Sequence, residues 1–277
     1  MVEVYFTTYW DFDVDFTIIC SYKCVDTLRT FLIIMMTQIF SIISLFLRSI
    51  ADYKSSATKY LVYTGMLALV VFAIIGYLGW KLSSVVGIWL ADLLPTSWSH
   101  ESTVFTFLTG IAIILLFWIL MKYIMLILMS PLLSLISEKI EKQISHEAQN
   151  AGFSFATSAA RSVRINLRNL TKEIVLSVIL LIAGLIPGIN VISLPLLFIV
   201  QAYFAGFGIM DFYLERHYTF SETKSLIWRH KWAAITLGSI FSLLMLVPII
   251  GVFFSPFLTT VTGTRYFASL NQTNPNT

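Results

Sequence analysis

Two long apolar stretches of this chain are each interrupted near the middle. Residues 174–209 and residues 233–261 are the two stretches, and the apolar run before each break holds about 14 or 15 residues, or roughly 21 to 23 Å of helix. A bilayer core is about 30 Å thick, so such halves are too short to cross it comfortably. Backbone that breaks at that depth must be packed in protein or line a wet cavity. The pattern predicts two helical hairpins that enter a membrane and return. Their tips are expected at Pro187, Gly188, Asn190, Pro248 and Gly251.

The composition is that of an integral membrane protein. Apolar residues make up 57% of the 277 residues and charged residues only 12%, against roughly 25% charged in soluble domains. The net charge of +3 fits basic loops beside an anionic leaflet better than nucleic-acid binding. We expect a single membrane domain over residues 35–277. Residues 1–34 are either a mis-assigned N-terminal extension or an acidic tail.

Two further stretches have the length of full membrane spans. Residues 60–80 are apolar with aromatic residues at both ends, as in interface belts. Residues 104–130 are apolar except for Lys122, which we expect to snorkel to the interface in preference to lining a pore. The second helix is expected to run on past Pro131. Residues 31–47 are shorter and partly polar, which favours an interfacial helix over a marginal span.

The predicted fold is therefore an all-α integral membrane protein with two long transmembrane helices plus two partly penetrating (re-entrant) helical hairpins. Its polar blocks set the orientation. Residues 48–59 hold three Lys or Arg, residues 138–172 hold six and residues 211–231 hold four, whereas residues 81–103 hold one. The positive-inside rule places the three basic blocks and the C-terminus in the cytoplasm, and residues 81–103 outside.

Two polar blocks carry candidate functional residues. Four cations recur at helical spacing and fall within roughly 80° of one another: Arg161, Arg164, Arg168 and Lys172. They form one face that contacts lipid phosphates, an anionic substrate or both. Asp211, Glu215 and Arg216 are expected to form a local ion pair at a hairpin base, in preference to coupling protons. Residues 219–222 have the spacing of a capping box, which predicts a helix start near Phe220.

The sequence lacks the motifs of common catalytic sites. It has no zinc-protease, phosphate-loop or nucleophile-elbow motif, and no pair of acids lies inside a predicted span. Cys20 and Cys24 are expected to be inert thiols, since nothing else indicates a disulfide framework or a metal site. We therefore expect neither enzyme activity nor a cofactor or metal.

Three stretches of the chain resemble the etoposide-induced/CysZ-like family of membrane proteins. They are residues 130–141 (SPLLSLISEKIE), residues 161–190, where a basic helix leads to an apolar run and Ile-Pro-Gly-Ile-Asn, and residues 210–222 (MDFYLERHYTFSE). A weaker fourth lies at residues 254–264. The resemblance implies two long transmembrane helices, two partly penetrating hairpins, a homo-oligomer and a role in sulfate uptake across a bacterial inner (plasma) membrane.

The chain departs from that family before the first long helix. The family's Gly-Leu-Arg stretch, where sulfate is thought to bind, is replaced here by Asp-Tyr-Lys-Ser-Ser-Ala-Thr-Lys at residues 52–59. A helix N-terminus favours anions, so this turn is still a candidate site. The candidate anion-binding residues are Lys54, Ser55, Ser56, Arg161, Arg164 and Arg168.

Two functions fit these observations. The first is an anion (sulfate-like) permease resembling CysZ, with an inorganic anion such as sulfate as its substrate. The second is a non-transporting membrane protein whose basic cytoplasmic face binds lipids or partner proteins. Membrane lipids are expected partners in both cases.

Overall fold

The computed structural model describes residues 15–51, 61–74, 77–78, 103–144, 155–184, 186, 188–247 and 249–273. All regular structure in these ranges is helical, which confirms the all-α class for the described part of the chain. The labelled helices are α1 (Asp15–Ala51), α3 (Thr103–Ile144), α4 (Phe155–Ala183), α5 (Asn190–Leu214), α6 (Phe220–Arg229), α7 (Lys231–Met245) and α8 (Ile250–Thr273). A shorter apolar helix, Leu61–Ile74, lies between α1 and α3 in the sequence.

Among the described residues, three helical segments are long and apolar enough to cross a membrane. They are Thr27–Ala51 in α1, Trp118–Ile144 in α3 and Asn190–Leu214, which is α5. These segments place the chain among integral membrane proteins, as its composition indicates. The predicted span at residues 60–80 is described as helix over Leu61–Ile74 and at residues 77–78, and its full length remains a prediction.

The first of these segments corrects the length expected of the helix at residues 31–47, and its interfacial placement stays a prediction. That stretch belongs to the 37-residue helix α1, and its apolar part has the length of a membrane span. The polar side chains that made it look marginal do not interrupt the helix. The hydroxyl of Thr37, for example, donates to the carbonyl of Ile33 one turn earlier, at 2.8 Å. Serine and threonine satisfy themselves in this way inside apolar helices.

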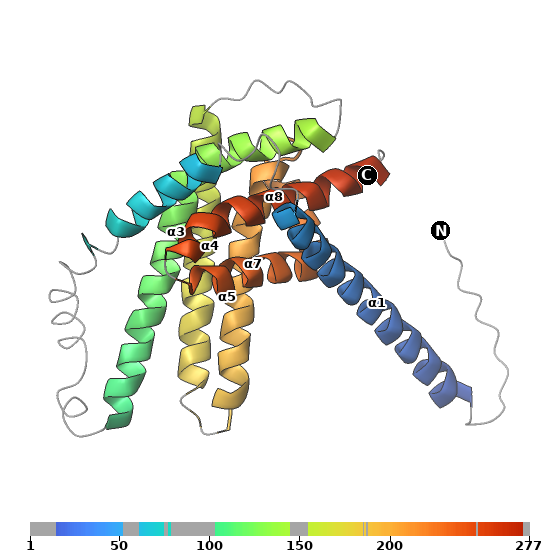
Figure 1. Ribbon diagram of the computed structural model, residues 1–277. Coiled ribbons are helices and arrows are strands. Elements are labelled where there is room, and N and C mark those ends of the chain that lie inside the picture. The colour runs from blue at the N-terminus through green and yellow to red at the C-terminus, as the bar shows by residue number, and fades with distance from the viewer. Residues whose placement is uncertain are drawn as a thin grey trace.

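The helix α3 runs past Pro131 to Ile144, as expected. Figure 1 shows α3 rising beside α4 and α5 and then bending, so that its C-terminal part runs across the top of the bundle. A proline inside a helix removes one backbone hydrogen bond and is a common cause of such a bend. The bend brings residues 130–141 over the end of α5.

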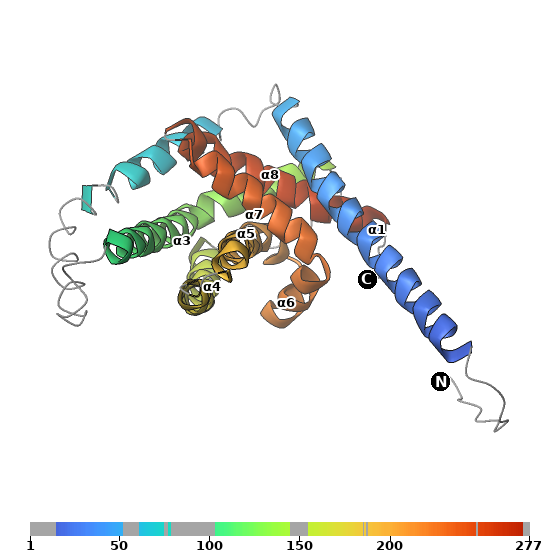
Figure 2. The ribbon, with the colours of Figure 1, turned by 90° about the horizontal axis from the view of Figure 1, so that it is seen from below.

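The remaining helices lie across this bundle. α3, α4 and α5 run side by side, and the α7–α8 hairpin crosses them, as both views show (Figures 1 and 2). The two hairpins, α4–α5 and α7–α8, are therefore not parallel. α1 contacts α7 and α8, and its N-terminal part extends away from the other helices.

Small residues allow α5 and α7 to cross at close range. A Cβ atom added to Gly206 would lie 1.9 Å from the Ala234 carbonyl oxygen, and one added to Gly238 would lie 1.8 Å from the Ala202 carbonyl oxygen. α5 thus presents Ala202 and Gly206 to α7, and α7 presents Ala234 and Gly238 to α5. This pattern lets helix backbones approach closely inside membranes, where packing drives helix association. The crossing fixes the second hairpin against the first.

Both hairpin turns contain backbone outside the helical region. Gly188 has φ +91°, as expected for its place in the first turn, and Ile249 has φ +65° in the second. A Cβ atom on Gly251 would lie 1.6 Å from the Leu244 carbonyl oxygen, so the second turn needs this glycine for close packing. Asn190 begins α5. The predicted tip residues Pro187 and Pro248 lie outside the described residues.

The short helix α6 begins at Phe220, as the capping-box spacing predicts. A carboxylate oxygen of Glu222, Oε2, accepts hydrogen bonds from the backbone nitrogen and the hydroxyl of Thr219, each at 2.8 Å. The bond from the backbone amide of Thr219 is the main reason that the pKa of Glu222 lies below its usual value. The cap fixes where the chain turns from α5 into α6.

Candidate functional site

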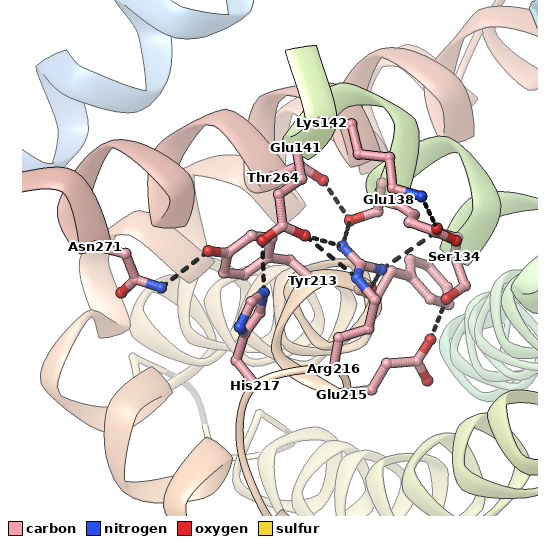
Figure 3. Close-up of polar contacts among 12 residues, drawn as sticks. Ser134, Glu138, Glu141, Lys142, Tyr213, Glu215, Arg216, His217, Thr264 and Asn271 are labelled. Carbon is pink, nitrogen blue, oxygen red and sulfur yellow. Dashed lines mark hydrogen bonds and ion pairs between the residues drawn. The ribbon is translucent and has the colours of Figure 1, made fainter. Parts of the chain in front are cut away.

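Two of the stretches that carry the family resemblance, residues 130–141 and 210–222, meet around one arginine, Arg216, just beyond the end of α5 (Figure 3). Its Nη2 lies 3.0 Å from Oε2 of Glu141 on α3, and the same nitrogen donates to the Ser137 hydroxyl at 2.8 Å. Its Nη1 donates to the carbonyl oxygens of Phe212 and Ser134 at 2.7 and 3.2 Å. The side chains of Arg216 and Glu141 are only 9% and 8% exposed. The guanidinium therefore ties α3 to the α5–α6 turn.

The second oxygen of Glu141 extends this arrangement. His217 Nε2 lies 2.6 Å from Glu141 Oε1, and its ring stacks on Tyr213 with 4.7 Å between ring centroids. Asn271 on α8 donates to the Tyr213 hydroxyl at 2.9 Å. We call the set centred on Arg216 the Arg216 network; its members are Ser134, Ser137, Glu141, Tyr213, Arg216, His217, Thr264 and Asn271. It joins residues from α3, α5, the α5–α6 turn and α8 (Figure 3).

The expected local ion pair among Asp211, Glu215 and Arg216 does not form. Arg216 pairs with Glu141, and Glu215 instead accepts a hydrogen bond from the Ser134 hydroxyl. Asp211 pairs with Arg161 on α4, with 3.0 Å between Oδ1 and Nη2. Asp211 faces α4, whereas Glu215 and Arg216, just beyond the end of α5, both face α3. The corrected arrangement clamps helices together and is not confined to the hairpin base.

Arg161 is accordingly committed to the protein. Its Nη2 also donates to the Thr223 hydroxyl at 3.0 Å, and its Nη1 donates to the Tyr218 carbonyl at 2.8 Å. Both terminal nitrogens of Arg161 thus donate hydrogen bonds to the protein itself, which leaves few donors for an anion. The structure separates it in role from Arg164, which is exposed, and Arg168, which is partly buried.

The outer side of α4 gathers positive charge. Arg168 lies over the rings of Phe207 and Phe220, at 5.8 and 5.1 Å from their centroids. Its Nη1 atom is buried and has no hydrogen-bond partner among the described residues. The positive charges of Arg168 and, less strongly, Lys224, together with partial desolvation, lower the pKa of Lys172. Arg164, Arg168, Lys172 and Lys224 form what we call the α4 cationic face. No ion pair joins it to a described acid.

The inner side of α4 carries a row of buried polar residues. Ser162, Asn166, Asn169, Glu173 and Ser177 recur every three or four positions and are each at most 4% exposed. We call this row the α4 polar stripe. Both amide atoms of Asn169, the Asn166 Oδ1 and the Ser177 hydroxyl are buried without a hydrogen-bond partner among the described residues. Buried polar groups are nearly always paired, so this local excess points to a polar ligand or water.

The backbone of α5 passes close to this stripe. A Cβ atom on Gly208 would lie 2.9 Å from Asn166 Oδ1 and 3.3 Å from Leu126 Cδ1, so the absence of a side chain there leaves room for the amide. Glycine at such a place marks close approach of a backbone or a ligand. The stripe is thus enclosed by α3 and α5.

An ion pair occupies the middle of the stripe. Lys122 Nζ donates to both carboxylate oxygens of Glu173 at 2.7 Å and to the Gln201 carbonyl at 3.3 Å. The Tyr123 hydroxyl donates to Glu173 Oε2 at 2.7 Å. The Lys122 and Glu173 side chains are 2% and 0% exposed. The expectation that Lys122 snorkels to the interface is therefore wrong, because a buried carboxylate on α4 satisfies it in place.

The other predicted site residues are only partly described. Lys54, Ser55 and Ser56 lie outside the described residues, so the candidate anion turn before the first long helix remains a prediction. Sequence reasoning missed Glu173 because it directly follows Lys172 and looks like the end of a polar block. The available signal was a lone lysine in one apolar helix with a lone acid at the edge of another, since charges at membrane depth pair. No group of three metal-ligating side chains occurs among the described residues.

One comparison with known proteins gives a match. The family model described as sulfate transporter CysZ/etoposide-induced protein 2.4 matches residues 45–256, which is most of the chain. A search of curated proteins gives none. The matched region contains the α4 cationic face, the α4 polar stripe, Lys122 and the α3 and α5 parts of the Arg216 network.

Proposed function

Because the chain belongs to the sulfate transporter CysZ/etoposide-induced protein 2.4 family, we propose that this integral membrane protein is a permease for a sulfate-like inorganic anion. The observation that carries the proposal is the arrangement of α4: within the described part of the chain, the cations on its outer side have no acidic partner, and polar groups on its buried side have no hydrogen-bond partner. Cations attract an oxyanion, and amide and hydroxyl groups replace part of its hydration shell.

The cationic face supplies the attraction. Arg168 brings a buried, unused N–H group, and its positive charge is the main cause of the lowered pKa of Lys172. A bound anion would relieve the repulsion between these two cations. Guanidinium groups suit the task because their fixed donors match the oxygens of sulfate in pairs. We assign the chain no catalytic step.

We propose the following topology. Residues 60–80 and 104–130 cross the membrane, and the α4–α5 and α7–α8 hairpins enter it from the cytoplasmic side without crossing. The basic blocks and the C-terminus face the cytoplasm of a bacterial cell, and copies of the chain assemble into a homo-oligomer in the inner membrane. The support is the charge asymmetry of the polar blocks, the two hairpin turns and the family.

The topology can be tested with single cysteines at the hairpin turns. Val191 and Ile249 are 74% and 63% exposed, so the protein would not shield a cysteine at either position from a thiol reagent. In a chain with Cys20 and Cys24 replaced by serine, both positions should react poorly with bulky impermeant thiol reagents from either side. Ready labelling of both from outside would mean that the helices cross the membrane fully.

The permease itself is tested by uptake of radiolabelled sulfate into proteoliposomes, with chloride and phosphate as competitors. Saturable uptake that phosphate or chloride reduces only weakly is the expected result. A double variant, Arg164→Ala/Arg168→Ala, should lose most of this uptake, whereas Arg48→Ala, an exposed change at the end of α1, should not. Absence of sulfate uptake by the wild-type protein would refute the proposal.

The alternative is a non-transporting protein that binds lipids or partner proteins through its basic face, and one observation favours it. Lys231 Nζ lies 5.0 Å from the ring centroid of Trp228 and 5.8 Å from that of Trp232. Trp228 is 62% exposed. An exposed tryptophan beside a lysine is typical of contact with lipid headgroups. This alternative predicts binding to anionic vesicles without any sulfate uptake.

A further inference from the structure

The Lys122–Glu173 pair lies in the middle of a row whose other members are underused. Asn169 is one helical turn before Glu173 on α4, and Ser177 is one turn after it. Both amide atoms of Asn169 and the Ser177 hydroxyl lack partners, whereas Lys122 uses all three ammonium protons. Unused hydrogen-bonding capacity therefore flanks a saturated ion pair on both sides.

A pair that served packing alone would gain nothing from such neighbours. An unpaired amide or hydroxyl in a protein interior costs roughly 1 to 3 kcal/mol, and apolar side chains of similar shape would avoid that cost. Four of the eight buried unpaired atoms among the described residues lie on the α4 polar stripe, and the outer side of the same helix carries the cationic face. The outer side of α4 thus attracts anions, and its buried side has polar groups that could hydrogen-bond to one.

The carboxylate of Glu173 resembles an inorganic oxyanion in what it accepts. It receives two hydrogen bonds from Lys122 and one from the Tyr123 hydroxyl, at 2.7 Å each. Sulfate accepts the same charge-assisted bonds from the same donors. The Asn169 amide, one turn away, would supply a further donor that the carboxylate does not use.

We infer that Glu173 is a tethered counter-ion: its carboxylate occupies Lys122 until an oxyanion on the α4 polar stripe displaces it and takes over its hydrogen bonds. The inference rests on the proposed permease function and adds to it a specific internal step. Glu173 keeps Lys122 from remaining as a lone buried charge when no anion is present, which would be costly. A displaced Glu173 carboxylate can accept a hydrogen bond from the unused Asn169 amide, one turn away on the same side of α4.

The first test compares Glu173→Gln with the wild type in sulfate uptake by proteoliposomes. The amide is close in shape to the carboxylate but uncharged, so Lys122 becomes available to sulfate. We expect the sulfate concentration at half-maximal uptake to fall about tenfold, the effect of roughly one charge-assisted hydrogen bond. Glu138→Gln is the matched control, because Glu138 pairs with Lys142 at the surface of α3. It should leave uptake unchanged.

The second test removes both charges together, so that no unpaired charge remains and folding is retained. In Lys122→Met/Glu173→Met, the inference predicts loss of saturable sulfate uptake, with a thermal unfolding midpoint near that of the wild type. A merely structural pair predicts uptake like that of the wild type in this double variant, and that result would overturn the inference.

The outcomes separate the inference from the proposed function. Wild-type vesicles that take up no sulfate would refute both. Wild-type uptake with an unchanged half-saturating concentration in folded Glu173→Gln would refute the tethered counter-ion and leave the permease in place. Should Glu173→Gln fail to fold, the double methionine variant still decides between a role in uptake and a role in packing.

Discussion

The Arg216 network and the α4 polar stripe are both buried, polar and built from several helices, yet they use their hydrogen bonds differently. Arg216 makes five hydrogen bonds to Glu141, Ser134, Ser137 and Phe212, and Glu141 binds His217 with its second oxygen. The stripe instead leaves four side-chain atoms of Asn166, Asn169 and Ser177 unpaired. When a buried polar group is fully hydrogen-bonded within the protein, the fold alone accounts for it. One that is unpaired calls for a ligand or water.

The comparison also separates the cations. Arg161 and Arg216 hold helices together, whereas Arg164, Arg168 and Lys172 lie on the outer side of α4 without a described acid. Sequence spacing alone groups Arg161 with Arg164 and Arg168. The structure divides them, because Asp211 on α5 reaches only the first. Variants in the two regions should therefore differ in kind: one set changes stability and the other changes anion handling.

The largest expected effect is on stability, in the Arg216 network. Glu141→Ala leaves Arg216 as an unpaired, nearly buried charge, which should lower the free energy of unfolding by about 3–5 kcal/mol. Glu138→Ala, one turn earlier on the same helix, removes only an exposed pair with Lys142 and should cost about 0.2–0.5 kcal/mol. Thermal unfolding in detergent micelles measures both. Similar shifts for the two variants would show that the network does not hold α3 to α5.

A smaller effect, on anion handling, is expected on the cationic face. Arg164→Lys keeps the charge but loses the paired donors of a guanidinium, so sulfate uptake should fall by roughly three- to tenfold while stability stays within about 0.5 kcal/mol. Binding to anionic liposomes should hold, since it follows charge. Equal sulfate uptake by the wild type, by this variant and by Arg164→Ala/Arg168→Ala would remove the face from the transport path and shift attention to Lys54, Ser55 and Ser56.

The smallest expected effect concerns pH, at the C-terminal end of α6. His230 Nδ1 lies 2.8 Å from the Tyr266 hydroxyl, and burial, aided by Arg229, lowers the pKa of His230. The unfolded chain then binds a proton near pH 6.5 that the folded chain binds only at lower pH. The stability contribution is thus complete above pH 6.5 and is lost as pH falls below it.

His230→Gln should remove this dependence. We expect the drop in unfolding midpoint between pH 7.5 and pH 5.5 to be smaller in the variant, by the equivalent of less than about 1 kcal/mol because the ring is partly solvated. Thermal unfolding of the two proteins at both pH values is the measurement. An equal drop in wild type and variant would assign the acid sensitivity to other groups.

Much of the fold follows from local sequence signals. Apolar runs, the breaks around Gly188 and Gly251, and the Thr219–Glu222 spacing predict the described hairpin helices and the start of α6. Such features depend on residues close together in the chain, where periodicity and capping act. The membrane class likewise follows from the composition.

The pairings inside the site could not be predicted in the same way. Lys122 and Glu173 are 51 positions apart, and Arg216 and Glu141 are 75 apart. Which charges meet depends on how each helix is rotated about its axis and where α3 bends, and local sequence patterns predict neither. The length of α1 was missed for a simpler reason, since hydroxyl groups that bond to their own helix look like interruptions in a hydropathy pattern.

The most direct test of the difference between the two regions is one substitution made in both. Asn169 has two unpaired amide atoms in the stripe. Asn271 gives a hydrogen bond to Tyr213 and receives one from Tyr218 at the edge of the Arg216 network. Leucine is close to asparagine in shape and makes no hydrogen bonds. Unfolding and sulfate uptake should be measured for Asn169→Leu and Asn271→Leu.

The two variants should change in opposite directions. Asn169→Leu is expected to raise the free energy of unfolding by about 1 kcal/mol and to reduce sulfate uptake by about tenfold or more. Asn271→Leu is expected to lower the free energy of unfolding by about 1–2 kcal/mol, with uptake per folded protein unchanged. If Asn169→Leu is destabilised and takes up sulfate as the wild type does, the α4 polar stripe is a packing feature and the distinction between the two regions fails.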